Sequence, residues 1–286
     1  MSIITVLQKL YIKNKSKMNS TQPTSPLLVK AIKAFSDNYI WCIHSNTANY
    51  IALVDPGDAD VCIKYIQDNK LQLSNILITH RHSDHVGGVE KLVKYCNDNN
   101  WPITVYGPTT EAIQYSNIQV KNADNIYLEA LAIDCRVLDI PGHTLGHIAY
   151  LIEDNLFCGD TLFSAGCGRV FDGTSEQLFN SLQTLSALSE KTQVYCAHEY
   201  TLSNLAFALT VDPSNEELVN YYNYVKKIRD KNQSSIPTSI CTEKKINPFL
   251  RCFDNNIKQS VEAYCNTTLI SELDIFTQLR NWKNEF

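Results

Sequence analysis

Residues 79–88 combine three histidines and a carboxylate at a spacing that suits metal ions. They read THRHSDHVGG and directly follow the apolar run 76–78. In an extended backbone His80, His82 and Asp84 project to one side, whereas His85 projects in another direction. Imidazole nitrogen and carboxylate oxygen are ligands of zinc and similar divalent metals. We therefore predict a metal site, with two adjacent ions favoured over one and over a surface loop that is merely rich in histidine.

Three polar residues later in the chain each follow an apolar, strand-like run. His143 lies in PGHTLGH, Asp160 ends FCGD, and His198 lies in AHEY. Folds that alternate strands and helices gather their functional groups at the ends of strands. These residues are therefore candidates for the same site. Taken singly, each also fits a turn or cap residue, and for Asp160 alone that interpretation is favoured.

The composition is typical of a globular protein with one large and one small domain. The chain has 286 residues, of which 44% are apolar and 19% charged, and a net charge of −5. This charge favours neither nucleic acid nor an anionic membrane as a partner, so an anionic substrate would need a local basic patch. The ten cysteines include no CxxC pair, which predicts free thiols in a reducing compartment such as the cytoplasm. For Cys167, between two glycines, a structural role is favoured over a reactive one.

The elements expected from hydrophobic periodicity divide the chain into three parts. Residues 1–26 are lysine-rich and then rich in Ser, Thr and Pro, which predicts a disordered extension, with Met18 as an alternative start. Residues 27–199 alternate short strands with turns and helices, and we expect a catalytic domain there. After His198 the strands stop, and the pattern predicts only helices, at 202–209, 215–231, 261–264 and 272–283. Residues 200–286 are therefore predicted to form a helical substrate-binding domain.

The HxHxDH segment, followed by PGHT, GD and a later histidine, resembles the metallo-β-lactamase superfamily over about residues 27–200. The resemblance implies an α+β fold, a four-layer αββα sandwich with two metal ions at one edge. Zinc is expected, with iron or manganese as alternatives. It implies that Asp55 orients a ligand imidazole, and it leaves His44 and His147 without a ligand role. The implied ligands are His80, His82 and His143 for one ion, Asp84, His85 and His198 for the other, and Asp160 as the bridge.

Four further segments resemble glyoxalase II, the hydroxyacylglutathione hydrolases, over nearly the whole chain from about residue 27. They read SAGCGRVFDGT (164–174), HEYT (198–201), NPFLR (247–251) and LRNWKNEF (279–286). The resemblance implies hydrolysis of S-(2-hydroxyacyl)glutathione, such as S-D-lactoylglutathione, by a metal-bridging hydroxide, the second step of methylglyoxal detoxification. Asp84 and Asp160 would act in catalysis. We expect a cytoplasmic monomer that binds neither nucleic acid nor membrane.

The same resemblance implies a binding site for glutathione in which the helical tail takes part. The implied contacts are Arg169, Phe171, Tyr200 and Arg251. Arginine suits the two carboxylates of glutathione, because its guanidinium binds a carboxylate in a forked geometry. Some family members have Tyr at the position of Phe171, and some have a second basic residue shortly after Arg251. Here Lys258 is a candidate for that second role.

Two other functions remain open on the sequence alone. One is a related hydrolase of the superfamily or a sulfur dioxygenase with a single iron, and the other is a non-catalytic module that depends on metal. A mononuclear site would leave several of the seven ligands unused, and a non-catalytic module predicts a lost ligand, which we do not find. Both observations favour the dinuclear hydrolase.

Overall fold

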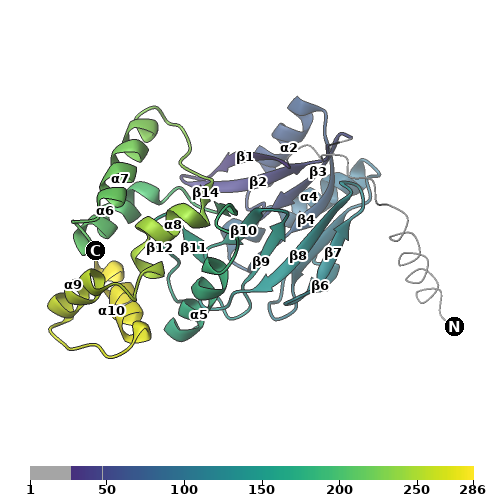
Figure 1. The fold of residues 1–286 in the computed structure, drawn as a ribbon. Helices are drawn as coiled ribbons and strands as arrows, with labels where there is room; N and C mark the ends of the chain where they lie inside the picture. Colours follow the sequence, from purple (N-terminus) through teal and green to yellow (C-terminus); the bar gives the residue numbers. More distant parts are fainter. Residues whose placement is uncertain (1–26, 47) are drawn as a thin grey trace, which may run out of the picture.

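The first of two six-stranded sheets carries the segment 79–88 at the end of one of its strands. The computed structural model describes residues 27–46 and 48–286, so the predicted extension at 1–26 lies outside the described residues. The first two strand pairings are antiparallel and the next three are parallel (Figure 1). In spatial order the strands are β1 (Leu28–Ala34), β2 (Asn38–His44), β3 (Tyr50–Val54), β4 (Gln72–Leu77), β5 (Thr104–Pro108) and β6 (Ile118–Val120).

The second sheet is antiparallel except for the pair β10 and β13. Its edge strand β14 comes from the tail predicted to be entirely helical, and a strand of two residues is too short to show a periodicity. In spatial order the strands are β14 (Thr238–Ser239), β13 (Gln193–Cys196), β10 (Asn155–Gly159), β9 (Ile148–Ile152), β8 (Ile133–Asp139) and β7 (Asn125–Leu128).

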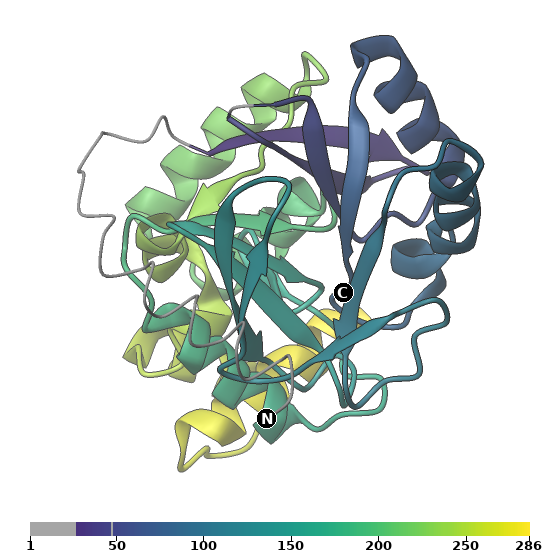
Figure 2. The ribbon, with the colours of Figure 1, turned by 90° about the vertical axis from the view of Figure 1, so that its right-hand side faces the viewer.

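The two sheets pack face to face with helices on both outer sides. Trp41 and Val54 of the first sheet share one buried core with Val137 and Tyr150 of the second. The helices α2 (Ala59–Asn69) and α4 (Val89–Asp98) cover the outer face of the first sheet (Figure 2), and α5 (Ser175–Ser186) packs against the second. The predicted α+β fold, a four-layer αββα sandwich, is confirmed.

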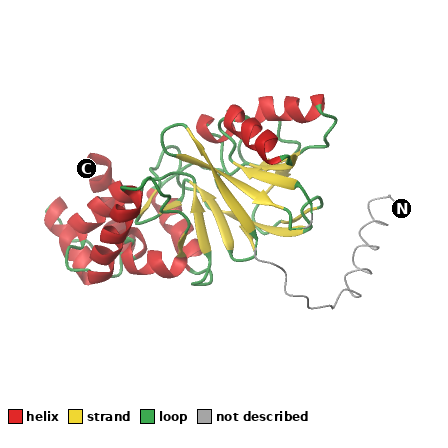
Figure 3. Ribbon diagram, turned by 90° about the horizontal axis from the view of Figure 1, so that it is seen from above, coloured by secondary structure: helices red, strands yellow, loops and turns green. Residues whose placement is uncertain are grey.

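The tail forms a group of helices at one end of the sandwich (Figure 3). The predicted helix at 261–264 is only the end of a longer helix, which starts at the Asp254 N-cap. The predicted domain boundary lies between the end of β13 and the start of the first tail helix. The tail elements are α6 (Thr201–Val211), α7 (Glu216–Arg229), α8 (Ile240–Ile246), a 3-10 turn (Pro248–Leu250), α9 (Asn255–Cys265) and α10 (Glu272–Glu285).

Side chains of these helices hold the backbone of a small hairpin, β11 (Leu162–Phe163) and β12 (Gly166–Cys167), which follows Asp160. Asn204 donates to the carbonyl of Ser164 at 3.1 Å, and Asn247 donates to that of Gly166 at 2.9 Å. The carboxylate of Glu243 accepts the backbone N–H of Ala165 at 2.8 Å. The tail therefore holds in place the hairpin that directly follows Asp160, one of the predicted metal ligands.

Within 27–46 and 48–286, no helix is long and apolar enough to cross a bilayer. All ten cysteines lie in this part of the chain and all are free, which confirms the prediction of unpaired thiols. Cys167 is buried, and burial raises the pKa of its thiol, as expected for a structural rather than a reactive residue.

We expect Glu243→Ala to destabilise the protein by about 3 kcal/mol, because Glu243 is fully buried and accepts three hydrogen bonds. The substitution removes the acceptor of the Ala165 N–H and of the Thr238 hydroxyl, whereas the amide of Asn247 keeps its bonds to the carbonyls of Phe163 and Gly166. Unfolding in urea measures the effect. The matched control is Glu217→Ala, which removes an exposed ion pair to Lys245 at 3.5 Å and should change stability by less than about 0.5 kcal/mol. Equal effects of the two substitutions would contradict the role assigned to Glu243.

Candidate metal centre

The first cluster consists of His80, His82 and His143, whose imidazole nitrogens lie close together. Nδ1 of His82 lies 3.1 Å from Nε2 of His80 and 3.1 Å from Nε2 of His143. His80 follows β4, and His143 lies in the loop between β8 and β9. These residues could hold a metal ion, because their ligand atoms all lie within 4.8 Å of one another.

The second cluster consists of Asp84, His85 and His198, whose ligand atoms also lie within 4.8 Å of one another. Oδ2 of Asp84 is 3.4 Å from Nε2 of His85 and 3.4 Å from Nε2 of His198. The expectation of an extended backbone through Asp84 is wrong, because helix α3 (Ser83–Val86) begins directly after His82. The carbonyl of His82 accepts the N–H groups of His85 and Val86, and this helical turn separates the directions of Asp84 and His85.

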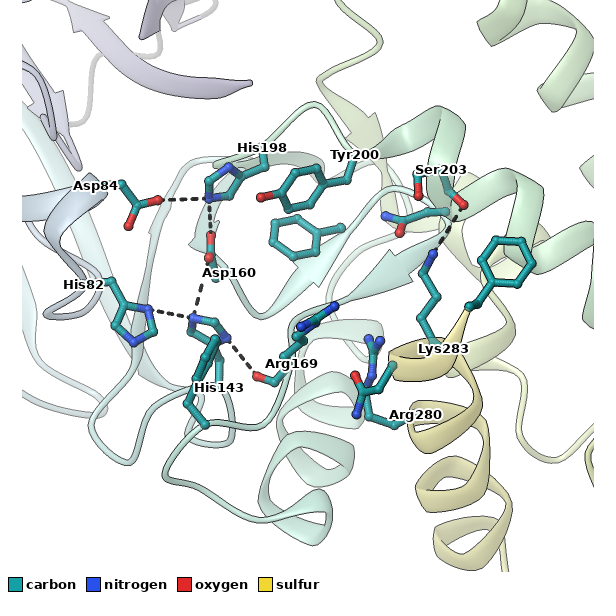
Figure 4. A pocket seen from close by; sticks show the side chains of 15 residues that line it. His82, Asp84, His143, Asp160, Arg169, His198, Tyr200, Ser203, Arg280 and Lys283 are labelled. Carbon is teal, nitrogen blue, oxygen red and sulfur yellow. Dashed lines mark hydrogen bonds and ion pairs between the residues drawn. The ribbon is translucent and has the colours of Figure 1, made fainter. Parts of the chain in front are cut away.

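The carboxylate of Asp160 lies between the two clusters. Its Oδ2 is 3.5 Å from Nε2 of His143, whereas its Oδ1 is 3.5 Å from Nε2 of His85 and 3.3 Å from Nε2 of His198. Gly159 allows this placement, because its φ is +48° and a Cβ would lie 2.4 Å from Oγ1 of Thr79. The two groups of predicted ligands therefore lie on either side of one carboxylate, and Figure 4 shows His82, Asp84, His143 and His198 around Asp160.

The outer edges of the imidazoles determine which nitrogens face inward. Nδ1 of His143 donates to the carbonyl of Arg169 at 2.8 Å, Nδ1 of His85 lies 3.0 Å from Asp55, and Nδ1 of His198 lies 2.7 Å from Asp37. In each ring Nε2 is thereby left to face the other ligands. Nε2 of His85 and Oδ1 of Asp160 are buried and have no hydrogen-bond partner among the described residues. Such an arrangement fits a divalent cation between the clusters, since the carboxylate and, once deprotonated, the imidazole can each offer it a lone pair.

The pKa values follow from burial and from these neighbours. Burial lowers the pKa of His80 well below its usual value and also lowers that of His143, so both rings are neutral, as a ligand must be. Burial also opposes the charge on His198, but the neighbouring carboxylates of Asp160, Asp84 and Asp37 raise its pKa to about 10. The carboxylates of Asp160 and Asp55 likewise raise the pKa of His85 above its usual value despite its burial.

A cavity of about 580 Å³ opens beside the clusters and extends to the C-terminal helix (Figure 4). Three of the predicted substrate contacts line it: Arg169, Phe171 and Tyr200. The ring of Phe171 meets the rings of His82 and His143 edge to face, each at 5.1 Å. The ring of Tyr200 is stacked on that of His198 at 4.7 Å. All three side chains are therefore close enough to the clusters to contact a ligand held there.

The structure places the fourth predicted contact, Arg251, outside the lining of this cavity. Its guanidinium pairs with Asp212 at 2.6 Å and with Asp254 at 2.5 Å, so both of its ends are already bound to carboxylates. Lys258, the candidate second base, lies 3.7 Å from Glu262 and is also absent from the lining.

Sequence reasoning missed two cations on α10, Arg280 and Lys283, which line the cavity opposite the clusters. Nη1 of Arg280 donates to the carbonyl of Cys167 at 2.8 Å, and its buried Nε has no partner among the described residues. Burial, Arg280 and Arg169 together lower the pKa of Lys283 to about 8. The spacing of three residues, which puts both on one helix face, was the available signal.

Known proteins resemble this chain in both sequence and fold. Residues 199–286 match the family model for the hydroxyacylglutathione hydrolase C-terminus, and residues 40–123 match that for the metallo-beta-lactamase superfamily. Hydroxyacylglutathione hydrolases of Shewanella baltica and Aliivibrio fischeri are 48% and 49% identical to the chain; each alignment covers 91% of the chain and 100% of the relative. The crystal structure of ETHE1 from Myxococcus xanthus has a TM-score of 0.63 at 24% identity, covering 90% of this chain and 91% of that one, which shows a shared fold.

Metal binding to the metal-free protein at pH 7 should release at least about two protons, because His85 and His198 are both protonated there and a ligand imidazole must be neutral. The proton on His198 is present below about pH 10 and lost above it, so release should fall as the pH approaches 10. A pH indicator in weakly buffered solution, with zinc added to chelator-stripped protein, measures this. Zinc binding without proton release at pH 7 would contradict the assignment of these two histidines.

Proposed function

This chain belongs to the hydroxyacylglutathione hydrolase family, and from that membership we propose that it hydrolyses the thioester of S-(2-hydroxyacyl)glutathione to glutathione and a 2-hydroxy acid. S-D-lactoylglutathione, which yields D-lactate in methylglyoxal degradation, is the proposed principal substrate. The observation that carries the proposal is a single cavity. The two candidate metal-binding clusters lie at one end of it, and the cations of Arg169, Arg280 and Lys283 lie at the other.

The proposed cofactors are two divalent ions, with zinc favoured over iron or manganese. His80, His82 and His143 would hold one ion, Asp84, His85 and His198 the other, and the two oxygens of Asp160 support a bridging role. When bound, such ions supply a hydroxide nucleophile at neutral pH and an electrophile for the thioester carbonyl. Asp55 supports the site by holding the outer nitrogen of His85.

Asp84 is the proposed catalytic carboxylate beside Asp160. Its side chain is 38% exposed and lines the cavity, so it can accept a hydrogen bond from the attacking water and orient it toward the thioester. The imidazoles of His198 and His85, each 3.4 Å away, lower the pKa of Asp84, which keeps the carboxylate charged in this role. The leaving thiol has a pKa of about 8.5 and departs as a thiolate, so a strong general acid is not needed.

The cationic end of the cavity is the proposed binding site for the glutathione carboxylates. Arg169 provides an exposed guanidinium, and Lys283 an ammonium that donates to the carbonyl of Ser203 at 3.4 Å. These charges create the local positive potential that a protein of net charge −5 needs to attract an anion. Phe171 and Tyr200 would contact the substrate through their rings. We assign Arg251 a supporting role instead, since Asp212 and Asp254 occupy its guanidinium.

The proposed setting is the cytoplasm, with free thiols as the supporting observation, and the proposed oligomeric state is a monomer. The proposed division into a catalytic domain at 27–199 and a substrate-binding domain at 200–286 is supported by helix α10, which supplies both Arg280 and Lys283.

Zinc-loaded protein should release free thiol from S-D-lactoylglutathione, measured with a thiol reagent, and should hold about two metal ions per chain. Asp160→Ala should remove the bridge and lower kcat by at least about a hundredfold. The matched control is Asp154→Ala, which removes a surface ion pair to Lys191 at 2.8 Å and should leave kcat unchanged. No thiol release, or one tightly held iron with oxygen consumption, would contradict the proposed hydrolase.

The specificity constant kcat/KM should fall as the pH rises through about 8, because Lys283 loses its positive charge there. Lys283→Arg keeps the charge and should remove this fall, whereas Lys283→Met should raise KM already at pH 7 with little change in kcat. Steady-state kinetics between pH 6.5 and 9.5 measure all three proteins. Lys244→Met, which removes an exposed lysine on α8, is the control. A pH profile of Lys283→Arg identical to that of the unchanged protein would refute the assignment.

A further inference from the structure

The turn between β1 and β2 lies behind the second cluster and touches two of its three ligands. Its residues 35–37 join Ala34 to Asn38, the first residue of β2, and we count Asn38 with the turn; all four lie far along the chain from residues 79–88 and His198. Tyr39 donates its backbone N–H to the carbonyl of Ala197 at 2.7 Å, and Glu199 donates to the carbonyl of Asp37 at 2.9 Å. These bonds form a bridge between Asn38 and His198, so the turn and residues 197–199 are held as one unit.

Asn38 holds the carboxylate of Asp84. The amide Nδ2 of Asn38 donates to Oδ2 of Asp84 at 3.0 Å, and the Asn38 side chain is buried. That oxygen is the one that faces both His85 and His198 at 3.4 Å. Asp84 stands on a helix of only one turn and its side chain is 38% exposed, so its rotamer depends on the groups that meet its carboxylate. Of these groups, Asn38 makes a direct hydrogen bond, which favours the rotamer in which the carboxylate turns toward the cluster.

Asp37 holds the ring of His198. Oδ1 of Asp37 accepts from Nδ1 of His198 at 2.7 Å, which leaves Nε2 as the inward nitrogen. The other oxygen, Oδ2, accepts from the hydroxyl of Ser36 at 2.8 Å, and the phenol of Tyr200 also hydrogen-bonds to Asp37. With both oxygens engaged, the carboxylate is fixed in place.

The two clusters differ in the groups that contact the outer nitrogens of their imidazoles. Behind the first cluster, His143 meets the carbonyl of Arg169 and His80 meets the hydroxyl of Thr79 at 3.0 Å. Behind the second, His85 and His198 each meet a carboxylate, from Asp55 and Asp37. A carboxylate behind an imidazole raises its basicity as a ligand, so the contacts of the turn act on one subsite and not on the other.

We propose that the β1–β2 turn is the positioning element of the second metal subsite, with Asn38 orienting Asp84 and Asp37 fixing the inward nitrogen of His198. The proposal rests on the dinuclear centre proposed above, but it concerns metal binding and not turnover. Asp37 and Asn38 are positioning residues, because they act on the ion only through Asp84 and His198. Their removal should therefore weaken one ion and leave the other.

Zinc competition with a graded chelator, starting from the loaded enzyme and without substrate, tests the proposal. Asn38→Leu and Asp37→Leu, which keep the side-chain size, should each weaken one of the two zinc ions by about 10–100-fold and leave the other unchanged. Asp37→Asn keeps an acceptor oxygen for Nδ1 of His198 and should recover most of the loss. The control on the same hairpin is Lys33→Leu, whose ammonium reaches only the carbonyl of Asn232 at 3.3 Å and which should bind zinc as the unchanged protein does.

Two outcomes would overturn the proposal. Retention of both ions with unchanged affinity in Asn38→Leu and Asp37→Leu would show that the turn does not position the subsite. An equal loss at both subsites would show a general structural defect, which thermal unfolding of the metal-free variants detects independently. Should Asp37→Leu fail to fold, Asp37→Ser, whose hydroxyl is too short to reach His198, carries the same expectation. Because no thioester is present, a failure of the proposed hydrolase function leaves this result unaffected.

Discussion

The structure depends on a convergence of groups that repel one another. Five imidazoles and two carboxylates turn their lone pairs toward a small region around Asp160, and Oδ1 of Asp160 is buried there without a hydrogen-bond partner among the described residues. Lone pairs in such an arrangement are unfavourable unless a cation or protons lie between them. For this reason the pKa values of His85 and His198 are raised in the metal-free protein. The protons on these two rings take the place that a metal ion would occupy between the carboxylates.

The same constraint explains the part played by the helical tail. The hairpin β11–β12 follows Asp160 directly, so its position affects where the carboxylate between the two clusters lies. Its backbone is hydrogen-bonded to three side chains of the tail, those of Asn204, Glu243 and Asn247. Arg280 donates to the carbonyls of Cys167 and Gly168 at the end of the hairpin. The tail thus supplies positive charge to the cavity and also anchors the segment that carries Asp160 and Arg169. In the proposed site, substrate binding and catalysis would therefore both depend on the position of this hairpin.

The local part of the site could be predicted from the sequence, whereas its long-range part could not. Most of the metal-type residues lie in short motifs directly after apolar strands, and strand ends meet at one edge of a sheet whatever the rest of the fold. Arg251 and Arg280 illustrate the limit. Both are arginines in helical tail segments, and only packing shows that Asp212 and Asp254 neutralise Arg251 while α10 directs Arg280 to the cavity. Likewise, Asp37 and Asn38 gain their partners only when β2 and the segment 197–199 come together.

His143 and His147 show why hydrogen bonding, rather than spacing, separates a ligand from its neighbour. Both lie in the same glycine-bracketed loop, and the ring of His147 is stacked on that of His80 at 4.5 Å. Nδ1 of His143 donates to a carbonyl, so its Nε2 is free to face the cluster. Nδ1 of His147 also donates to a carbonyl, of Ile148, but its Nε2 accepts the backbone N–H of Asp160 at 3.2 Å. The lone pair of His147 thereby accepts from the backbone of Asp160, and burial keeps that ring neutral by lowering its pKa. A histidine whose two nitrogens are both bonded to backbone cannot serve as a ligand, although it can set the position of one.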